Sequence, residues 1–319
     1  MWAAIWRLCA GWAVRLTALG VLGVSAAMVA GGWLLPPADQ IAYMGNRDLQ
    51  YDLFLYDARA RLTVQLTHTQ TANERYPAWS PDGAFIAYHA NPRNHYDLYI
   101  MRADGRGQRH LELDGDLRWY DQAMIAWSPD GETLAFHAGM NGVDFALYLI
   151  AVDGGEAVEL VRGEGDHVHV SWSPDGERVA FAVYPSAPLS DPQDENGTLY
   201  IAEVADLLDD APDALTEIGR GVFPVWSPDG GAIAYVSSIN ENDDIFVFDL
   251  ASGVHRQLTF TAPFWASTQP EWTSDGEHIV YASNRRGSFD IYMIGREGGE
   301  PRRITFTPYH AQAPAFRPG

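Results

Sequence analysis

The sequence contains no lysine and a single cysteine, Cys9, near its amino terminus. The absence of lysine excludes Schiff-base and other lysine-dependent chemistry. A lone cysteine excludes both a disulfide within the chain and a thiolate metal site. Basic charge is also scarce, because 21 arginines face 42 acidic residues and leave a formal charge of -21. A chain this acidic, without a basic stripe, repels polyphosphates, so we predict no nucleic-acid partner.

Aromatic residues are abundant by contrast. The chain has 11 Trp and 15 Tyr, and 47% of its residues are hydrophobic. This composition excludes a disordered protein and favours β structure, where aromatic side chains fit half-buried pleated surfaces. At 319 residues the chain is long enough for one repeat domain or two ordinary domains.

An uncharged apolar run extends from Leu16 to Leu35 and follows Arg7 and Arg15. Its length of about 20 residues suffices to cross a bilayer, and the arginines predict a cytoplasmic amino terminus. We therefore predict one hydrophobic helix that anchors the protein in the membrane over residues 1–35, and a linker over residues 36–40. The remaining chain would be extracytoplasmic at a bacterial cytoplasmic membrane. The alternative is a signal peptide cleaved near Ser25-Ala26-Ala27, which leaves a secreted or periplasmic protein.

A repeated motif carries the strongest signal for the fold. Trp-Ser-Pro-Asp-Gly begins at Trp79, Trp127, Trp172 and Trp226, with the variant Trp-Thr-Ser-Asp-Gly at Trp272. The period is roughly 45 to 54 residues, which is typical of a propeller blade. The turn chemistry predicts a hairpin, because Pro, Asp and Gly suit successive turn positions.

Three further strands are predicted in each repeat. The second is an apolar triplet with a small centre, such as Ile86-Ala87-Tyr88, and the third is an apolar run such as Leu98-Tyr99-Ile100. The fourth strand is marked by Leu66-Thr67, Leu215-Thr216, Leu258-Thr259 and Ile304-Thr305.

The two ends of the repeat region complement each other. The chain after the linker begins with a second strand at Ile41-Ala42-Tyr43, and residues 314–319 match the segment Pro77–Gly83 with Phe in place of Trp. The carboxyl terminus is therefore predicted to supply the inner strand of the first blade. We predict an all-β, six-bladed β-propeller over residues 41–319, with four-stranded antiparallel blades and no free edge.

The repeat resembles the TolB-like, WD-like propeller family, in which Pro-x-Trp-Ser-Pro-Asp-Gly is followed by an Asp before the third strand. Asp52, Asp97, Asp244 and Asp290 occupy that Asp position. The resemblance implies the propeller fold and is weakly specific for function. TolB itself carries an α/β domain before its propeller, and here the first strand follows the apolar run closely, so we do not identify the chain as TolB. No Gly-x-Ser-x-Gly motif follows the repeats, which argues against a serine hydrolase.

The repeat predicts two different faces of the propeller. The turn face carries the short turns between first and second and between third and fourth strands. The crossover face carries the longer loops between second and third strands and the connections between blades. Variable loops on a rigid scaffold are where binding usually occurs. The candidate binding residues, all on the crossovers, are Arg75, Tyr76, Trp119, Tyr120, Asp121, His167, His169, Phe264, Trp265, Tyr309 and His310.

The predicted function is binding of an envelope protein or peptide through the crossover face, with no catalytic residues and no cofactor. The alternative is a lyase or hydrolase acting on a glycan, with a metal or acid-base site at the channel mouth. His167 and His169, two apart on a strand, would share a face there and act with His310 and Asp121. Positions equivalent to His169 in the other blades differ, so no symmetric ligand ring is predicted. These positions are Tyr76, Met124, Phe223, Gln269 and Ala313.

Overall fold

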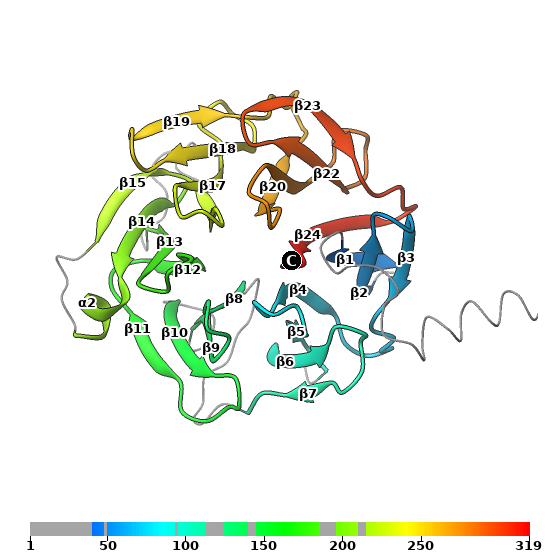
Figure 1. Cartoon of the computed structure of the whole chain (residues 1–319), viewed down its shortest axis with the longest axis horizontal. Coiled ribbons are helices and arrows are strands. Elements are labelled where there is room, and N and C mark those ends of the chain that lie inside the picture. Colours follow the sequence, from blue (N-terminus) through cyan, green and yellow to red (C-terminus); the bar gives the residue numbers. More distant parts are fainter. Residues whose placement is uncertain are drawn as a thin grey trace, which may run out of the picture. The chain divides into compact units, whose positions relative to one another are not determined.

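The computed structural model describes residues 40–47, 50–92, 95–112, 124–139, 145–185, 196–209 and 215–319. These residues form six four-stranded antiparallel sheets arranged around a central axis (Figure 1). The predicted six-bladed β-propeller is therefore confirmed. The helix predicted over residues 1–35 lies outside the described residues, within which no helix is long and apolar enough to cross a membrane.

The first three blades, in chain order, follow the predicted arrangement of four strands. Blade I contains β24 (His310–Phe316), β1 (Gln40–Arg47), β2 (Gln50–Asp57) and β3 (Leu62–Gln65). Blade II contains β4 (Glu74–Trp79), β5 (Phe85–Ala90), β6 (Asp97–Arg102) and β7 (Arg109–His110). Blade III contains β8 (Ile125–Trp127), β9 (Thr133–Ala138), β10 (Ala146–Ala151) and β11 (Val158–Val161).

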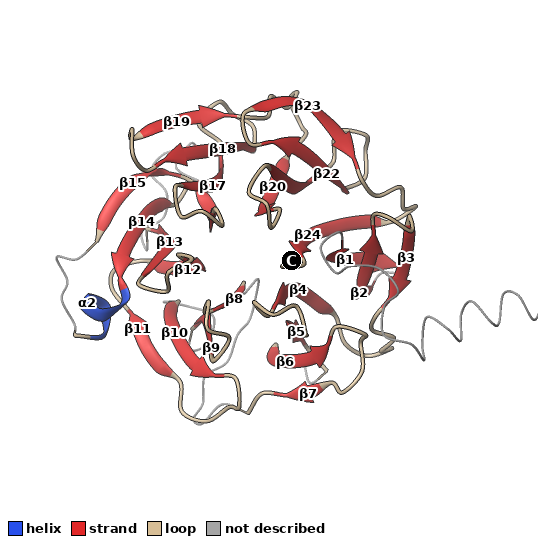
Figure 2. Cartoon of the chain, in the orientation of Figure 1, coloured by secondary structure: helices blue, strands red, loops and turns tan. Residues whose placement is uncertain are grey.

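The other three blades repeat the same order. Blade IV contains β12 (Asp166–Trp172), β13 (Arg178–Tyr184), β14 (Thr198–Glu203) and β15 (Thr216–Arg220). Blade V contains β16 (Val222–Trp226), β17 (Ala232–Ser237), β18 (Asp244–Asp249) and β19 (Val254–Gln257). Blade VI contains β20 (Ser267–Trp272), β21 (His278–Ser283), β22 (Asp290–Gly295) and β23 (Gly298–Arg303). Figure 2 shows a short helix, α2 (Val204–Leu208), after the third strand of blade IV.

The ring closes as the sequence predicts. Strand β24 pairs with β1, with Ile41 opposite Phe316 and Asn46 opposite His310. The indole of Trp79 on blade II donates to the carbonyl of Ala315 on β24 at 3.1 Å. The carboxyl-terminal strand therefore completes blade I and also contacts blade II.

The core lies between adjacent blades, where the second and third strands of one blade pack against the inner strand of the next. The small residue at the centre of each second strand is fully buried, because a larger side chain would hold the neighbouring blade away. These residues are Ala42, Ala87, Ala135, Ala180, Ala234 and Val280.

Each inner strand except the short β8 contains a bulge, where two of its residues oppose one residue of the second strand. In those five strands the first bulged residue has a left-handed backbone, with φ between 47° and 58°. These residues are Tyr76, His169, Phe223, Gln269 and Ala313. A bulge bends its strand and redirects the side chains that follow, so it breaks the simple alternation expected along the strand.

A tryptophan hydrogen bond links three of the blade junctions. Trp79 donates to Ala315, Trp127 to Ala78 at 3.0 Å and Trp272 to Val225 at 3.1 Å. The indole nitrogens of Trp172 and Trp226 are buried without such a partner. Both sides of blade IV therefore lack this bond.

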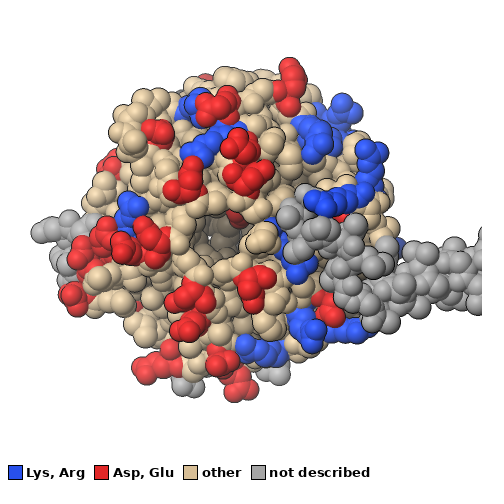
Figure 3. Space-filling view, in the orientation of Figure 1, with Lys and Arg blue, Asp and Glu red and all other residues tan. Residues whose placement is uncertain are grey.

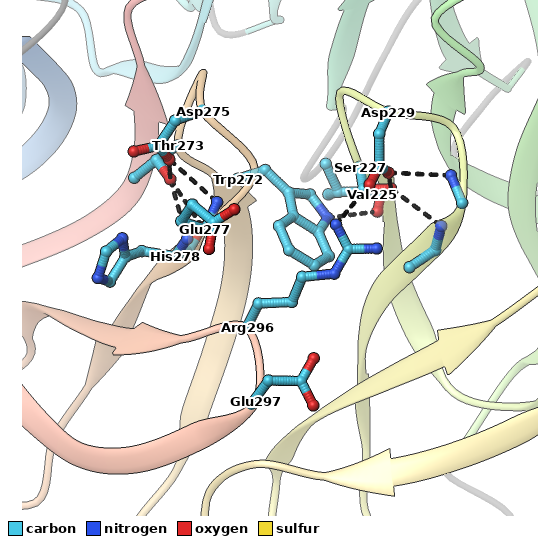
Figure 4. A network of polar contacts seen from close by, with 12 residues as sticks. Val225, Ser227, Asp229, Trp272, Thr273, Asp275, Glu277, His278, Arg296 and Glu297 are labelled. Carbon is cyan, nitrogen blue, oxygen red and sulfur yellow. Dashed lines mark hydrogen bonds and ion pairs between the residues drawn. The ribbon is translucent and has the colours of Figure 1, made fainter.

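Figure 4 shows the junction of blades V and VI, where the bond from Trp272 is reinforced by an arginine. The guanidinium of Arg296 lies 5.3 Å from the Trp272 ring centre and 2.6 Å from the carboxylate of Asp229 on blade V. Asp229 also accepts a bond from Ser227, and both contacts hold the pKa of its carboxyl down at about 2. Asp229 therefore stabilises its own turn and also joins blade V to blade VI.

The aspartate before the third strand holds the end of the fourth strand in place. Thr259 donates to Asp244 at 2.7 Å while its hydroxyl accepts from the backbone nitrogen of Ile245. The same contacts join Thr67 to Asp52 and Thr305 to Asp290. In these three blades the predicted Leu-Thr or Ile-Thr pair directly follows the fourth strand, whereas Leu215-Thr216 stands at the beginning of β15.

Candidate functional site

The turn aspartates that recur in the repeat have structural roles. In blade II the Ser80 hydroxyl donates to Asp82 at 2.6 Å, and the backbone nitrogen of Ala84 donates to the same oxygen at 2.9 Å. These hydrogen bonds hold the pKa of Asp82 below its ordinary value, and the same pattern lowers it for Asp130, Asp175 and Asp275. Carboxylates used in this way complete a hairpin and are poor acids or bases for catalysis.

Arg75 is placed on the crossover face by the start of β4. Its guanidinium lies 4.6 Å from the Tyr51 ring centre and 5.6 Å from that of Tyr96, so it stacks between two aromatic rings. Tyr51 comes from blade I and Tyr96 from blade II. The Tyr51 hydroxyl in turn contacts Gln312 of β24 at 3.5 Å. The predicted residue Arg75 therefore helps to join the first two blades on this face.

His169 is buried rather than exposed at the channel mouth. Its ring centre lies 3.9 Å from that of Phe223 on blade V and 5.9 Å from that of His137 on blade III. Burial, followed by the nearby His137, holds the pKa of His169 well below the ordinary value, so the ring is neutral at pH 7. His169 thus fills the inter-blade space beside the bulge.

The other candidate histidines are held at separate places. The Nδ1 atom of His167 contacts the carbonyl of Gly165 at 3.1 Å, and burial lowers the pKa of this histidine. His310 is exposed on blade I, where its Nδ1 accepts from the backbone nitrogen of Phe289 at 3.1 Å. Within the described part of the chain, no three His, Cys, Asp or Glu residues are grouped to hold a metal ion. The structure therefore does not bring His167, His169 and His310 together.

Tyr309 packs at the entry to the closing strand. Its ring centre lies 5.2 Å from that of Phe54, and burial raises the pKa of its phenol. Tyr76, at the bulge of β4, is buried and lines the central channel. Trp119, Tyr120 and Asp121 lie outside the described residues, so their role remains a prediction.

Phe264 and Trp265 are the predicted residues that project most clearly from the crossover face. Phe264 is 97% exposed and Trp265 is 43% exposed. The backbone nitrogen of Trp265 donates to the carbonyl of Ala262 at 3.1 Å, with Pro263 and Phe264 between them. Phe264 has φ 74°. A proline followed by a residue with positive φ defines a type II turn, in which the second position normally holds glycine.

The turn that presents Phe264 is fixed at both ends. The backbone nitrogen of Thr261 donates to Asp244 at 3.0 Å, and that of Ala266 donates to Asn284 at 2.7 Å. An exposed phenylalanine therefore occupies a strained position on a well-anchored loop. Such strain is typical of functional positions.

Three exposed apolar residues on the crossover face of blades V and VI were not predicted from the sequence. Phe260 is 78% exposed, Phe306 is 74% exposed and Ile239 is 59% exposed. Phe260 and Phe306 each follow the Thr that bonds the third-strand aspartate, in adjacent blades. The available signal was a phenylalanine that follows Leu-Thr in blade V and Ile-Thr in blade VI, at the start of each crossover.

A cavity of about 300 Å³ occupies the central channel. Its wall consists of the inner strands and the turns that follow them, including Trp79, Trp127, Trp172, Trp226 and four turn prolines. Figure 3 shows a central hollow surrounded by acidic side chains. The candidate positions on the crossovers lie at one end of the channel, whereas the cavity extends to the turn face.

Six four-stranded blades, an inner-strand tryptophan and a Ser-Pro-Asp-Gly turn define a six-bladed β-propeller. Residues 198–319 match the family model described as the TolB beta propeller domain. The resemblance of the repeat to the TolB-like propeller family is thereby confirmed. No curated protein matches the sequence.

Solved structures agree with this assignment. TolB from Acinetobacter baumannii is similar with a TM-score of 0.70 and 18% identity, over 89% of this chain and 67% of that one. A putative TolB from Agrobacterium tumefaciens gives 0.64 and 19% identity, over 86% and 91% of the two chains. Oligogalacturonate lyase from Vibrio parahaemolyticus gives 0.52 and 14% identity, over 86% and 75%. At these identities the likeness is one of fold, and the fold serves both binding proteins and enzymes.

Proposed function

We propose that the protein binds a protein or peptide partner in the bacterial envelope through its crossover face. The observation that supports this most strongly is the exposed aromatic group on blades V and VI. Phe260, Phe264, Trp265 and Phe306, with Ile239, form what we call the aromatic patch. Large exposed apolar residues gathered on one face mark interaction sites, and aromatic side chains dominate binding hot spots.

The loop geometry favours binding over simple packing. Because both ends of the Thr261–Ala266 loop are hydrogen-bonded, Phe264 is presented without further ordering of the backbone. A preorganised loop loses little entropy when a partner binds. The nearby Arg303 lies 4.7 Å from the Phe306 ring centre and 2.6 Å from the carboxylate of Asp290, so the rim of the patch is polar. The partner should present apolar side chains with a polar border.

The entry point of the chain is compatible with a tether. Strand β1 begins at Gln40 on the turn face, where Gln40 accepts a bond from Arg317 at 2.6 Å. The proposed anchor over residues 1–35 and linker over residues 36–40 would precede this strand. In either the anchored or the cleaved form, the propeller would lie in the bacterial envelope and could meet an envelope partner there.

The test is a crosslinking pull-down from native membranes with the full chain. A variant carrying Phe264→Ala and Trp265→Ala is compared with Phe85→Ala, which changes an exposed aromatic on the turn face. We expect the same partner to be captured by the native chain and by Phe85→Ala, and to be lost with the double variant. Equal capture by all three proteins would refute the proposal that the aromatic patch is the binding surface.

A further inference from the structure

One carboxylate lies inside the otherwise uncharged central channel. The residue before each inner-strand Trp or Phe lines the cavity, and these six positions form a ring around the axis: Ala78, Ala126, Ser171, Val225, Glu271 and Ala315. Of the described residues that line the cavity, Glu271 alone carries a formal charge. Its position breaks the near six-fold repeat of small or apolar residues.

The contacts of Glu271 leave it able to accept a ligand. One carboxylate oxygen accepts from the backbone nitrogen of Trp272 at 3.0 Å. At the equivalent position of blade IV, Ser171 makes a different contact, because its hydroxyl accepts from the backbone nitrogen of Trp226 on blade V at 3.2 Å. Within the described part of the chain, no arginine or histidine forms an ion pair with Glu271. The contact of the Glu271 carboxylate is to the next residue of its own strand, so Glu271 does not join two blades as Ser171 does.

The surroundings of Glu271 are strongly desolvating. Its accessible surface is intermediate, and that surface faces the channel, while protein atoms enclose the carboxylate from the remaining directions. Burial therefore raises the pKa of Glu271 to about 8. An unpaired carboxylate in this environment gains more from a cation than an exposed one does, because there is little water to compete.

The mouth of the channel on the turn face is acidic as well. Its turns carry Asp82, Asp130, Asp175, Asp229 and Asp275, whose hydrogen bonds lower their pKa values and keep them ionised. Figure 3 shows acidic side chains around the hollow. Arg296 pairs with Asp229, Arg178 lies 3.8 Å from Asp175, and Arg317 acts on Asp82, so these acids are partly balanced. The remaining excess of acidic charge raises the local concentration of cationic ligands.

We propose that the central channel is a second binding site, in which Glu271 receives one guanidinium or ammonium group entering from the turn face. The cavity of about 300 Å³ suits one side chain or a small amine, whose aliphatic stem would contact the proline and alanine walls. This site is separate from the aromatic patch and does not depend on the function proposed for it. Ion pairing requires ionised Glu271, so binding at pH 7 releases a proton.

The experiment measures the binding of two probes to the full chain by titration calorimetry at low salt. Agmatine represents a free cation, and a hexapeptide with one central arginine among glycines and serines represents a partner's side chain. We expect native protein to bind at least one probe about tenfold more tightly at pH 9 than at pH 7, because the ionised fraction of Glu271 rises from about one tenth to about nine tenths. Buffers with different ionisation enthalpies should report proton release at pH 7.

Variants assign the binding to the channel. Glu271→Gln keeps an acceptor for Trp272, and Glu271→Ser copies the residue found in blade IV. Both should weaken binding at least tenfold and remove its dependence on pH. Glu277→Gln, which changes an exposed acid in the turn after β20, should alter binding little. Binding of agmatine identifies a small-amine site, and binding of the peptide alone identifies a partner's arginine. The proposal is overturned if native protein binds neither probe at millimolar concentration at pH 9, or if Glu271 and Glu277 variants behave alike.

Discussion

Phe264 occupies a backbone conformation that costs an L-residue roughly 1 to 2 kcal/mol relative to glycine. Its φ is 74° and its side chain makes little contact with the rest of the protein. We predict that Phe264→Gly raises the free energy of unfolding by about 1 kcal/mol, because relief of strain outweighs the added freedom of the unfolded chain. Urea denaturation measures the change. Phe260→Gly, at a similarly exposed residue without positive φ, should instead be neutral or destabilising, and a loss of stability with Phe264→Gly would contradict the strain argument.

A second residue-scale prediction concerns Glu74, which is 1% exposed at the start of β4. The Thr67 hydroxyl lies 3.3 Å from Glu74 and 3.4 Å from Asp52, so its single hydrogen serves only one of the two carboxyls. Burial raises the pKa of Glu74 to about 7 from an ordinary value of 4.5. The folded protein therefore holds an extra proton between these values, and the contribution of Glu74 to stability falls as pH rises from about 4.5 through 7.

Glu74→Gln should remove this dependence on pH. The shift corresponds to about 3 kcal/mol at most, so we expect the variant to be more stable than native protein by up to that amount at pH 8 and by little at pH 4.5. Urea denaturation at the two pH values gives the difference directly. Glu277→Gln, which removes an exposed acid, serves as the control. A stability difference between native protein and Glu74→Gln that is the same at both pH values would show that Glu74 does not titrate in this range.

At the scale of elements, the tryptophan bonds distinguish blade junctions that are otherwise alike. Trp272 and Trp226 are both buried, and each lies against an arginine, Arg296 at 5.3 Å and Arg178 at 4.8 Å. Only Trp272 donates its indole hydrogen, to Val225. We predict that Trp272→Phe destabilises the protein by about 1 to 2 kcal/mol more than Trp226→Phe, since it also leaves a buried carbonyl without its donor. Chemical denaturation of the two variants tests this, and equal losses would assign the effect to packing alone.

At the scale of the whole molecule, ring closure depends on strand β24. Removing residues 310–319 would expose the edge of β1 and delete the acceptor of the Trp79 bond. Because domains are stable by only about 5 to 15 kcal/mol, we expect the truncated chain to unfold or aggregate at 25 °C. Circular dichroism and size-exclusion chromatography provide the measurement. Removal of Pro318 and Gly319 alone, beyond β24, should leave cooperative melting intact, and a truncated chain that melts like the native one would show that closure is dispensable.

The number of blades, their strand order and the closing strand were predictable because the information is local. A Ser-Pro-Asp-Gly turn with the contacts seen at Ser80 and Asp82 forms from adjacent residues. It recurs in four blades, and blade VI has the variant Thr-Ser-Asp-Gly. The position of His169 was not predictable in the same way. Regular alternation along a strand would place His167 and His169 on one face. The bulge that begins at His169 bends strand β12 at this point, so the alternation does not hold across it.

The sequence by itself determined the propeller, since its turns and apolar periodicity allow each repeat to form only one kind of sheet, and it located Phe264 and Trp265 on an exposed crossover. The tertiary structure decided what no single repeat contains. It placed Arg75 between Tyr51 and Tyr96, buried His169 against Phe223, and set Glu271 in a ring with five small or apolar residues from other blades. The physical reason is that bulges and blade-to-blade packing join residues far apart in the chain, whose proximity depends on closing the whole ring.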